Sequence, residues 1–321
     1  MWAVSCYFNP CRYERRLRNH RLFHARLGVP LLTIELSHDG GFDLEDGDAD
    51  VIVRRRTPHV LWQKERLLNV AIAALQPDCD KVAWLDGDVL FARDDWHEEA
   101  AGMLDDFAMV QLFSRCTDLP RDTLPPHGPP TGRAFAHLHA QGGHDAELFE
   151  AMWGSHLEGT QVRRKLSSGF AWAGRRELLE RHGLYDACVL GSGDRAIACA
   201  AYGRAATSTQ NFIRNERQRR HYLDWAGPFA ASVAGRVSYV EGDIHHLWHG
   251  ELRDRRYRER WREFAAHGFD PTTDIAVDDS GCWRWSSDKP AMHAYVREYF
   301  AQRREDGDLL DSPLDPLEQR P

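Results

Sequence analysis

The sequence of 321 residues has no long apolar run, no closely spaced pair of cysteines and no excess of basic charge. No segment reaches the roughly 18 apolar residues of a membrane-spanning helix, and no basic region followed by an apolar core marks a secretory signal. A net charge of -8 and a pI near 6.1 argue against binding to nucleic acid or anionic lipid through bulk charge. The seven cysteines form no Cys-x-x-Cys pair, which favours reduced thiols. We therefore expect a cytoplasmic protein without a membrane span.

Strand-like and helix-like segments alternate through the first third of the chain. Strands are expected at residues 2–7, 31–36, 51–53, 82–85 and 108–112, with helices between them at 13–27, 61–75 and 94–104. This alternation predicts an α/β fold with a mainly parallel sheet flanked by helices.

The second part of the chain is less regular. Residues 114–165 are rich in proline and glycine and are interpreted as a long loop, an insertion that could form the wall of an acceptor site. Beyond it we expect strands at 170–173 and 244–248 and helices at 175–181, 195–201 and 252–264. A C-terminal helical addition is expected to pack on the core through Trp283, Trp285, Tyr295 and Phe300.

The stretch that ends in Asp86-Gly87-Asp88 is a candidate site for binding a ligand and a cation. The same tripeptide occurs at residues 46–48 and 306–308, but only the copy at 86–88 follows an apolar, strand-like run. Ligands of parallel α/β folds bind at the carboxyl ends of strands. Two carboxylates beside a glycine can hold a hard divalent cation, which is commonly shared with the phosphates of a nucleotide. A plain turn is the alternative interpretation.

Three further segments carry candidate site residues, and each also has an ordinary explanation. The expected helix at 61–75 presents Lys64, Arg66 and Asn69, of which Lys64 and Arg66 could simply be solvated. The glycine-rich turn at 191–194 ends in Asp194, a possible general base or a helix cap. His245, His246 and His249 form a late cluster that could ligate a metal or be structural. Trp172 could stack on a sugar or belong to the core.

The order of these segments resembles the GT-A superfamily of metal-dependent glycosyltransferases, with the pattern nearest to the beta-1,4-galactosyltransferases and related inverting enzymes. The resemblance spans roughly residues 2–262 and rests on the Leu-Leu-Asn-Val run at 67–70, the acidic strand end, the acidic turn and the late histidines. It implies a GT-A fold with a nucleotide-sugar-binding half at 1–113, an acceptor and catalytic half at 114–303, and a flexible acidic tail at 304–321.

The resemblance also implies roles for individual residues. Asp88 is the expected direct metal ligand, with Asp86 holding the ribose or the metal through water, and His249 as the third ligand, for which His246 is the alternative. Asp194 matches the catalytic base, although the family's Trp is missing and its Glu-Asp pair is here Gly193-Asp194, which leaves the inverting outcome open. The residues expected to bind the donor are Tyr7, Lys64, Arg66, Asn69, Asp86 and Trp172.

The sequence thus predicts a glycosyltransferase that moves a sugar from a nucleotide sugar, with UDP as the favoured carrier, to a hydroxyl acceptor. Mixed carboxylate and imidazole ligands favour Mn²⁺, with Mg²⁺ as an alternative. The acceptor is expected to be a glycan, and a hydroxylated base in DNA is a second possibility. The rival functions are a nucleotidyltransferase, disfavoured because residues 7–12 contain no glycine, and a non-catalytic protein that binds a sugar nucleotide or glycan.

Overall fold

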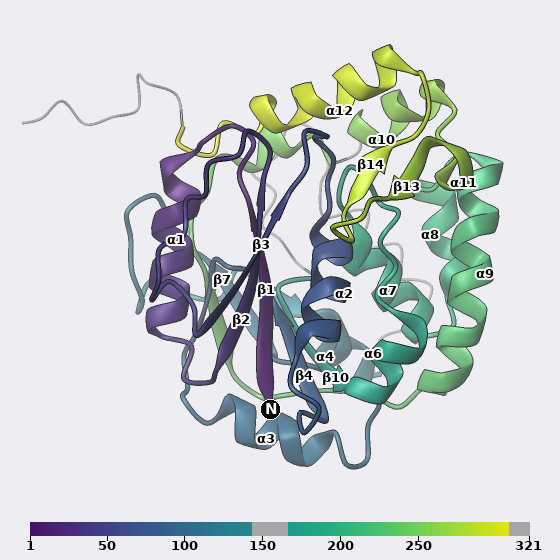
Figure 1. Cartoon of the computed structure of the whole chain (residues 1–321). Coiled ribbons are helices and arrows are strands. Elements are labelled where there is room, and N and C mark those ends of the chain that lie inside the picture. Colours follow the sequence, from purple (N-terminus) through teal and green to yellow (C-terminus); the bar gives the residue numbers. More distant parts are fainter. Residues whose placement is uncertain (143–165, 258, 308–321) are drawn as a thin grey trace, which may run out of the picture.

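A computed structural model of the chain describes residues 1–142, 166–257 and 259–307. A large sheet runs through the centre of the molecule, with helices on both sides (Figure 1). Within the described residues its seven strands follow the order β11 (Val237–Tyr239), β6 (Met109–Gln111), β10 (Ala171–Arg175), β4 (Lys81–Leu85), β1 (Trp2–Phe8), β2 (Leu31–Ser37) and β3 (Val51–Arg56). Neighbouring strands are parallel except that β10 runs antiparallel to β4 and β6. The expected mainly parallel α/β sheet is confirmed.

Helices cover both faces of this sheet because strands buried on both sides need two apolar layers. On one face, α1 (Glu14–Ala25) and α3 (Trp96–Met103) contribute Phe23 and Trp96 to one apolar cluster. On the other face lies a larger cluster, to which four helices contribute: α2 (Lys64–Ala74), α6 (Arg176–His182), α7 (Gly193–Ala201) and α9 (Glu216–Val233). The carboxyl ends of β1 and β4 therefore lie between these two layers of helices.

A second, smaller sheet is attached at these carboxyl ends. Its described strands follow the order β5 (Val89–Phe91), β12 (Asp243–His246), β7 (Arg115–Asp118), β8 (Gly132–Ala134) and β9 (Leu166–Ser167). The expectation of a continuous loop from residue 114 is wrong for residues 115–118 and 132–140, which form β7, β8 and α4 (Phe135–Ala140), whereas residues 119–131 between them have no helix or strand. Local sequence did not predict β7 and β8 because each is a short strand that pairs with distant segments. The rest of that expected loop, residues 143–165, lies outside the described residues.

The C-terminal part packs back on the core as expected. It comprises α8 (Ala205–Asn211), η1 (Leu252–Arg255), α10 (Glu259–Phe264), η2 (Ala265–His267), α11 (Pro271–Asp274), β13 (Ile275–Val277), β14 (Trp283–Trp285) and α12 (Pro290–Gln302). Trp285 and Phe300 belong to the larger apolar cluster, and Trp283 and Tyr295 pack against it. The single helix expected at 252–264 is instead interrupted at Arg256, which has a left-handed φ of 44°.

The expected start of the flexible tail is also wrong. Residues 304–307 follow α12 into the protein, and Glu305 is fully buried, with 0% of its surface exposed. The carboxylate of Asp306 accepts hydrogen bonds from the backbone N–H groups of Glu14 and Arg15, at 3.1 and 2.8 Å, and so caps the N-terminus of α1. Residues 308–321 lie outside the described part of the chain.

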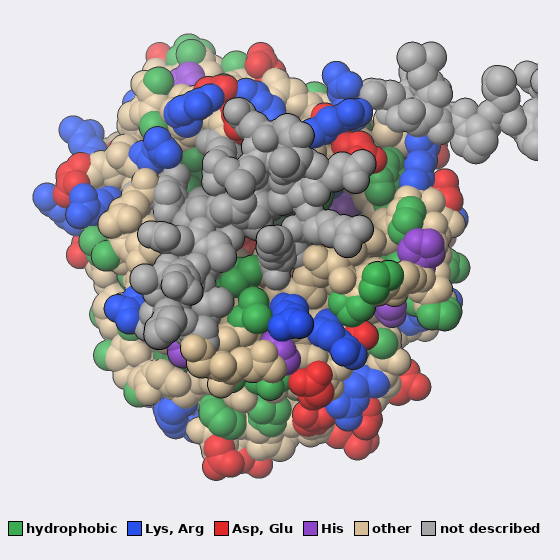
Figure 2. Space-filling model, turned by 180° about the vertical axis from the view of Figure 1, so that it is seen from behind, with side chains coloured by type: hydrophobic (Ala, Val, Ile, Leu, Met, Phe, Trp, Pro, Cys, Tyr) green, Lys and Arg blue, Asp and Glu red, His purple; other side chains and the backbone are tan. Residues whose placement is uncertain are grey.

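The surface adds two observations. Within the described ranges, no helix combines the length and the apolar character needed to cross a bilayer. On the face drawn in Figure 2, Lys and Arg side chains of the described residues are interspersed with Asp and Glu side chains. The described basic groups of this face are therefore not gathered into one continuous patch.

Candidate active site

A cavity lies at the carboxyl ends of β1 and β4, where parallel α/β folds bind ligands. Its lining includes six cationic side chains, those of Arg16, Lys64, Arg195, Arg255, Arg260 and Arg303, and four carboxylates, those of Glu65, Asp86, Asp88 and Asp194. His246 and His249 also line it. A cavity with this lining suits a ligand that carries several negative charges together with hydroxyl groups.

The main chain fixes the acidic strand end on both sides. Asp86 donates its backbone N–H to the carbonyl of Phe170, 2.8 Å away, and the carbonyl of Asp88 accepts the N–H of Leu247, also at 2.8 Å. In the second sheet, His246 is paired with Val89 on one side and with Asp118 on the other. Strand register thus brings Asp88, His246 and Asp118 together from three distant parts of the sequence.

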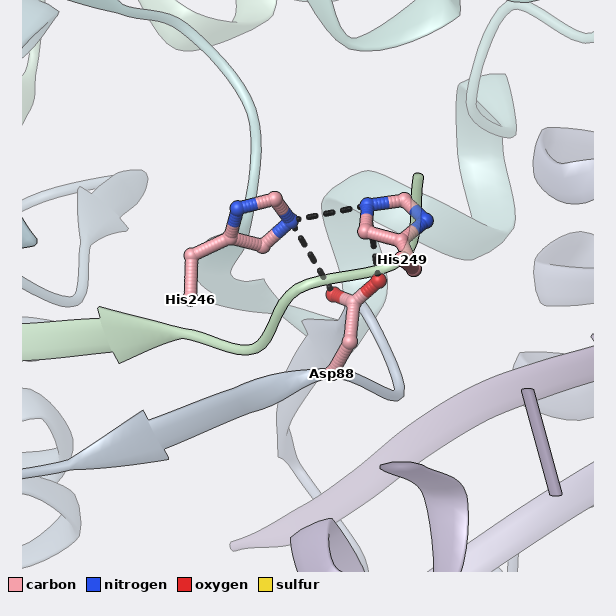
Figure 3. Close-up of side chains that lie close together, drawn as sticks. All are labelled: Asp88, His246 and His249. Carbon is pink, nitrogen blue, oxygen red and sulfur yellow. Dashed lines mark hydrogen bonds and ion pairs between the residues drawn. The ribbon is translucent and has the colours of Figure 1, made fainter. Parts of the chain in front are cut away.

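Asp88, His246 and His249 form the cluster shown in Figure 3. Nε2 of His249 lies 3.4 Å from Oδ2 of Asp88, and Nε2 of His246 lies 3.8 Å from Oδ1. One ligand atom from each residue lies within 4.8 Å of the others. Oδ1 of Asp88 is a buried atom without a hydrogen-bond partner among the described residues, which is unusual in a folded protein unless an ion or water satisfies it. One carboxylate and two imidazoles fit a divalent transition metal.

The groups behind the two imidazoles decide which nitrogen carries the proton. Nδ1 of His246 lies 2.9 Å from Oδ1 of Asp118, so this carboxylate can accept the Nδ1 proton and leave Nε2 able to bind a cation. Arg255 donates from Nη2 to Nδ1 of His249 over 2.7 Å, which favours a proton on Nε2. Ligation through Nε2 of His249 therefore requires its proton to move to Nδ1, where Oε1 of Glu305 lies 3.8 Å away.

The electrostatics of the cluster favour ligation at neutral pH. Burial tends to raise the pKa of Asp88, but His249 and His246, together with Arg16 and Arg255, outweigh it and lower the pKa below its ordinary value. Burial, with help from Arg255, lowers the pKa of His249 to about 4, so its imidazole is neutral near pH 7. A carboxylate and a neutral imidazole are the forms that bind metal.

Asp86 faces a different partner from Asp88. The ammonium group of Lys64, at the start of α2, forms an ion pair with Asp86. Burial raises the pKa of Asp86 although the charge of Lys64 opposes this shift. The two carboxylates of the motif therefore have separate surroundings, with Asp88 facing the histidines and Asp86 facing a lysine.

Asp194 reaches the cavity from the first turn of α7. Ser192, which precedes the helix, has a left-handed φ of 73°, and its Oγ accepts hydrogen bonds from Arg260 at 3.0 Å and Trp261 at 3.2 Å. The carboxylate of Asp194 lies against Gly169, where a Cβ atom would collide with Oδ2 and lie 3.1 Å from Cγ. This carboxylate is thus held in the same cavity as Asp88.

Arginines form a cationic wall that is organised by one buried carboxylate. Glu305 forms ion pairs with Arg16, with Arg255 at 3.1 Å and with Arg303 at 2.6 Å. Burial acts against ionisation, but Arg16, a hydrogen bond with His249 and the charge of Arg255 outweigh it and hold the pKa of Glu305 well below its ordinary range. All three arginines line the cavity, so Glu305 positions the cations that face a bound ligand.

The structure brings together some of the residues predicted to bind the donor and separates others. Tyr7, Lys64 and Asp86 line the cavity. Arg66 and Asn69 instead face a groove between α2 and α9, where Arg66 donates to the carbonyl of Gly281 at 2.6 Å. Asn69 there donates to the carbonyl of Leu184 at 2.9 Å. Because successive helical residues point 100° apart, α2 cannot present all three polar side chains to one cavity.

Trp172 lies in the core and not on the cavity. Only 3% of its surface is exposed, its ring stacks on Trp84, and its Nε1 donates to the carbonyl of Ser168 over 2.9 Å. Trp172 is therefore a core residue, and the expectation that it contacts a sugar is wrong. Trp62, two residues before α2, lines the cavity instead, and its buried Nε1 has no hydrogen-bond partner among the described residues.

Sequence reasoning missed several residues that line the cavity or hold the groups that line it. These are Arg16, Glu65, Asp118, Arg255, Arg260, Arg303 and Glu305. Glu65 is adjacent to Lys64 in the motif that was recognised, so it alone carried a local signal. The others lie in or next to helices, at the end of β7 or in the segment that follows α12, and their sequence surroundings resemble those of ordinary solvated residues.

No protein-family model and no curated protein matches this chain, but solved structures of transferases are similar to it. One is the galactosyltransferase LgtC in complex with donor and acceptor sugar analogs, at 12% identity over 83% of this chain and 95% of that chain, with a TM-score of 0.35. Another is a mutant of Drosophila beta-1,4-galactosyltransferase 7 with manganese, UDP-Gal and xylobiose, at 11% identity over 92% and 98% of the chains and a TM-score of 0.36.

The structure of a synthase is also similar. It is the 4-diphosphocytidyl-2C-methyl-D-erythritol synthase of Anaerococcus prevotii, at 11% identity over 75% of this chain and 86% of that chain, with a TM-score of 0.32. At such low identities and TM-scores, likeness decides neither the substrate nor the role of any residue. The chemistry of the cavity has to decide between these classes of enzyme.

Proposed function

We propose that this chain is a metal-dependent glycosyltransferase that moves a sugar from a nucleotide-sugar donor to a hydroxyl acceptor. The observation that carries the proposal is the meeting, in one cavity, of the Asp88, His246 and His249 cluster with the carboxylate of Asp194. A metal cluster alone would suit many enzymes. The additional carboxylate supplies the base that a hydroxyl acceptor needs.

Asp88, His246 and His249 would hold the divalent cation, for which Mn²⁺ suits the mixed oxygen and nitrogen ligands and Mg²⁺ is the alternative. When bound, the cation supplies positive charge that stabilises a departing nucleoside diphosphate. Arg16, Arg255 and Arg303 add fixed positive charge on the same side of the cavity. Because Glu305 holds these groups before a ligand arrives, little reorganisation is needed when negative charge develops.

Asp194 would accept the proton of the acceptor hydroxyl as the oxygen attacks the anomeric carbon. The new bond to the acceptor oxygen forms as the bond to the diphosphate breaks, which inverts the anomeric centre. The close contact of Asp194 with Gly169 restrains the carboxylate in the position from which it would accept this proton. Lys64 and Asp86, paired at the strand end, would contact the ribose or the diphosphate, with UDP as the proposed nucleotide.

For the acceptor we propose a glycan hydroxyl in preference to a hydroxylated base in DNA. Recognition of DNA needs cations that are free to neutralise phosphates. Two segments of the sequence are rich in arginine, residues 214–220 and 253–262. In these segments, Arg217 pairs with Asp270 at 3.3 Å and Arg256 with Glu263 at 2.6 Å. Arg255 and Arg260 are buried in the cavity wall.

The test measures thermal stability and product release with a panel of UDP- and GDP-sugars in Mn²⁺, Mg²⁺ or EDTA. A ligand at 100 times its dissociation constant stabilises by about 2.7 kcal/mol, which raises the melting temperature of a chain of this size by about 4 °C. We expect a Mn²⁺-dependent shift with one donor that is lost in Asp88→Ala. Asp46→Ala is the matched control, because Asp46 belongs to another Asp-Gly-Asp run and its side chain is fully exposed.

Asp194→Asn separates catalysis from binding. It should keep the donor-dependent shift and lose release of the nucleoside diphosphate, since only the base is removed. Unchanged turnover in Asp194→Asn would show that another group accepts the proton. A wild-type protein that binds a donor but transfers its sugar to no glycan, hydroxylated DNA or water would be a binding protein, and the proposal would fall.

A further inference from the structure

Glu65 is a buried carboxyl group in the cavity to which the mechanism above gives no task. It is the second residue of α2, only 3% of its surface is exposed, and it lines the cavity with Asp86 and Asp194. Burying a carboxyl group costs free energy unless a partner compensates it. The adjacent ammonium group of Lys64 forms its ion pair with Asp86. A buried acid in this position calls for an explanation beyond packing.

Gly193 makes the space that Glu65 occupies. A Cβ atom on Gly193 would collide with Cδ and Oε1 of Glu65 and would lie 2.7 Å from its Cγ. Gly193 is the first residue of α7, and the left-handed positions of this turn fall on Gly191 and Ser192, so backbone conformation does not demand glycine at 193. Steric space does. The carboxyl group of Glu65, from helix α2, thus occupies the space that a side chain at position 193 would fill.

The carboxyl group of Glu65 can both donate a hydrogen bond to a hydroxyl ligand and accept one from it. Burial raises its pKa to about 8, with Lys64 opposing the shift and Asp194 adding to it. Near neutral pH the group therefore carries a proton in most molecules and can donate one hydrogen bond while its other oxygen accepts another. Vicinal hydroxyl groups of a sugar offer the complementary donor and acceptor.

Depth in the cavity indicates which sugar lies there. A donor that is enclosed before the acceptor arrives occupies the buried part of the site, and the acceptor must enter from the open side. Glu65, which is nearly inaccessible, is therefore placed for the donor's sugar. We propose that Glu65 binds hydroxyl groups of the donor's sugar and determines which sugar is accepted. This inference rests on the proposed transferase function.

The test compares two ligands that differ only by the sugar. Wild type and Glu65→Leu, which has a similar shape but no hydrogen-bonding group, are titrated with UDP and with the UDP-hexose that stabilises the wild type most, both with Mn²⁺. UDP affinity should stay within about twofold, because Glu65 does not contact the diphosphate. Affinity for the UDP-hexose and its kcat/KM should fall by about 10- to 100-fold, as expected for loss of a strong hydrogen bond. Arg66→Gln, the next residue on α2 but facing the other groove, should leave both affinities unchanged.

A carboxylate exchange provides the second variant. Glu65→Ala should lose affinity for the UDP-hexose, and adding Gly193→Asp should restore at least part of it, because a carboxylate one bond beyond the Cβ of residue 193 returns to the vacated space. Restored binding in the double variant cannot come from a merely structural role of α2.

Two outcomes overturn the inference and leave the proposed function intact. In one, Glu65→Leu binds UDP and the UDP-hexose as the wild type does. In the other, it loses both affinities equally, which would mean that Glu65 only supports α2. A wild-type protein that binds neither UDP nor any UDP-hexose would refute the inference together with the proposed function. The wild-type titration therefore distinguishes failure of the proposed function from failure of the inference alone.

Discussion

Replacing Glu305 by Gln should destabilise the protein far more than its place near the C-terminus suggests. The carboxylate is completely buried among Arg16, Arg255 and Arg303. Removing one partner of a buried ion pair costs about 3–5 kcal/mol, because the remaining charges stay buried without compensation. Unfolding entropy of about 2.1 cal/mol/K per residue converts this loss into a fall of about 4–7 °C in melting temperature for this chain.

The dependence of this effect on pH follows from the pKa of Glu305. The guanidinium groups hold the folded-state pKa well below the ordinary value of 4.5, so the carboxylate stabilises the fold fully above that value. This contribution is lost as the pH falls from 4.5 towards the folded-state pKa. The difference in stability between wild type and Glu305→Gln should therefore be constant from pH 6 to 8 and shrink in acid.

Urea unfolding at several pH values, together with calorimetry, measures both effects. Glu177→Gln is the matched control, because it makes the same substitution in a pair with Arg181 whose glutamate side chain is 78% exposed. That variant should change the stability by less than about 0.5 kcal/mol. If Glu305→Gln were as stable as Glu177→Gln at pH 7, the cationic wall would not depend on this carboxylate and the reasoning would be refuted.

Three further predictions concern the cavity. Asp88→Ala should weaken binding of Mn²⁺ itself by at least about tenfold in a calorimetric titration without nucleotide, since the cluster loses its carboxylate; unchanged Mn²⁺ affinity would place the metal elsewhere. Gly169→Ala should lower kcat and spare donor affinity, because the added methyl group displaces the carboxylate of Asp194; wild-type kcat in this variant would show that the base is not held there. Burial raises the pKa of Glu65 to about 8, so the folded state holds a proton that the unfolded state has released, and stability should fall by up to about 1.4 kcal/mol per pH unit between about pH 5 and 8. Glu65→Gln should lack this decline, and an identical pH profile in the variant would contradict the assignment.

The sequence by itself determined the elements that local pattern encodes. The apolar run of β4, followed by Asp86-Gly87-Asp88, predicted a strand end with two carboxylates, and the structure has it there. The alternation of short apolar runs with amphipathic segments predicted the mainly parallel sheet. These predictions succeeded because strand and helix periodicities act over a few residues and because parallel strands share one functional edge.

Only the tertiary structure decided which polar residues face the cavity. Lys64 and Glu65 point into it, whereas Arg66 and Asn69, in the same run of sequence, point away. Trp172 was assigned to the core by its stacking on Trp84. The orientation of α2 depends on packing against distant strands, which no local pattern encodes.

The C-terminal segment gives the clearest contrast. From sequence, residue 304 began an acidic, frayed tail. In the fold, Glu305 pairs with Arg16 across 289 positions of the chain and with Arg255 across 50. An acidic residue near a terminus is solvated unless distant cations enclose it. The sequence therefore determined the sheet and its acidic edge, and the fold decided which charges surround that edge, because burial and charge pairing are long-range properties.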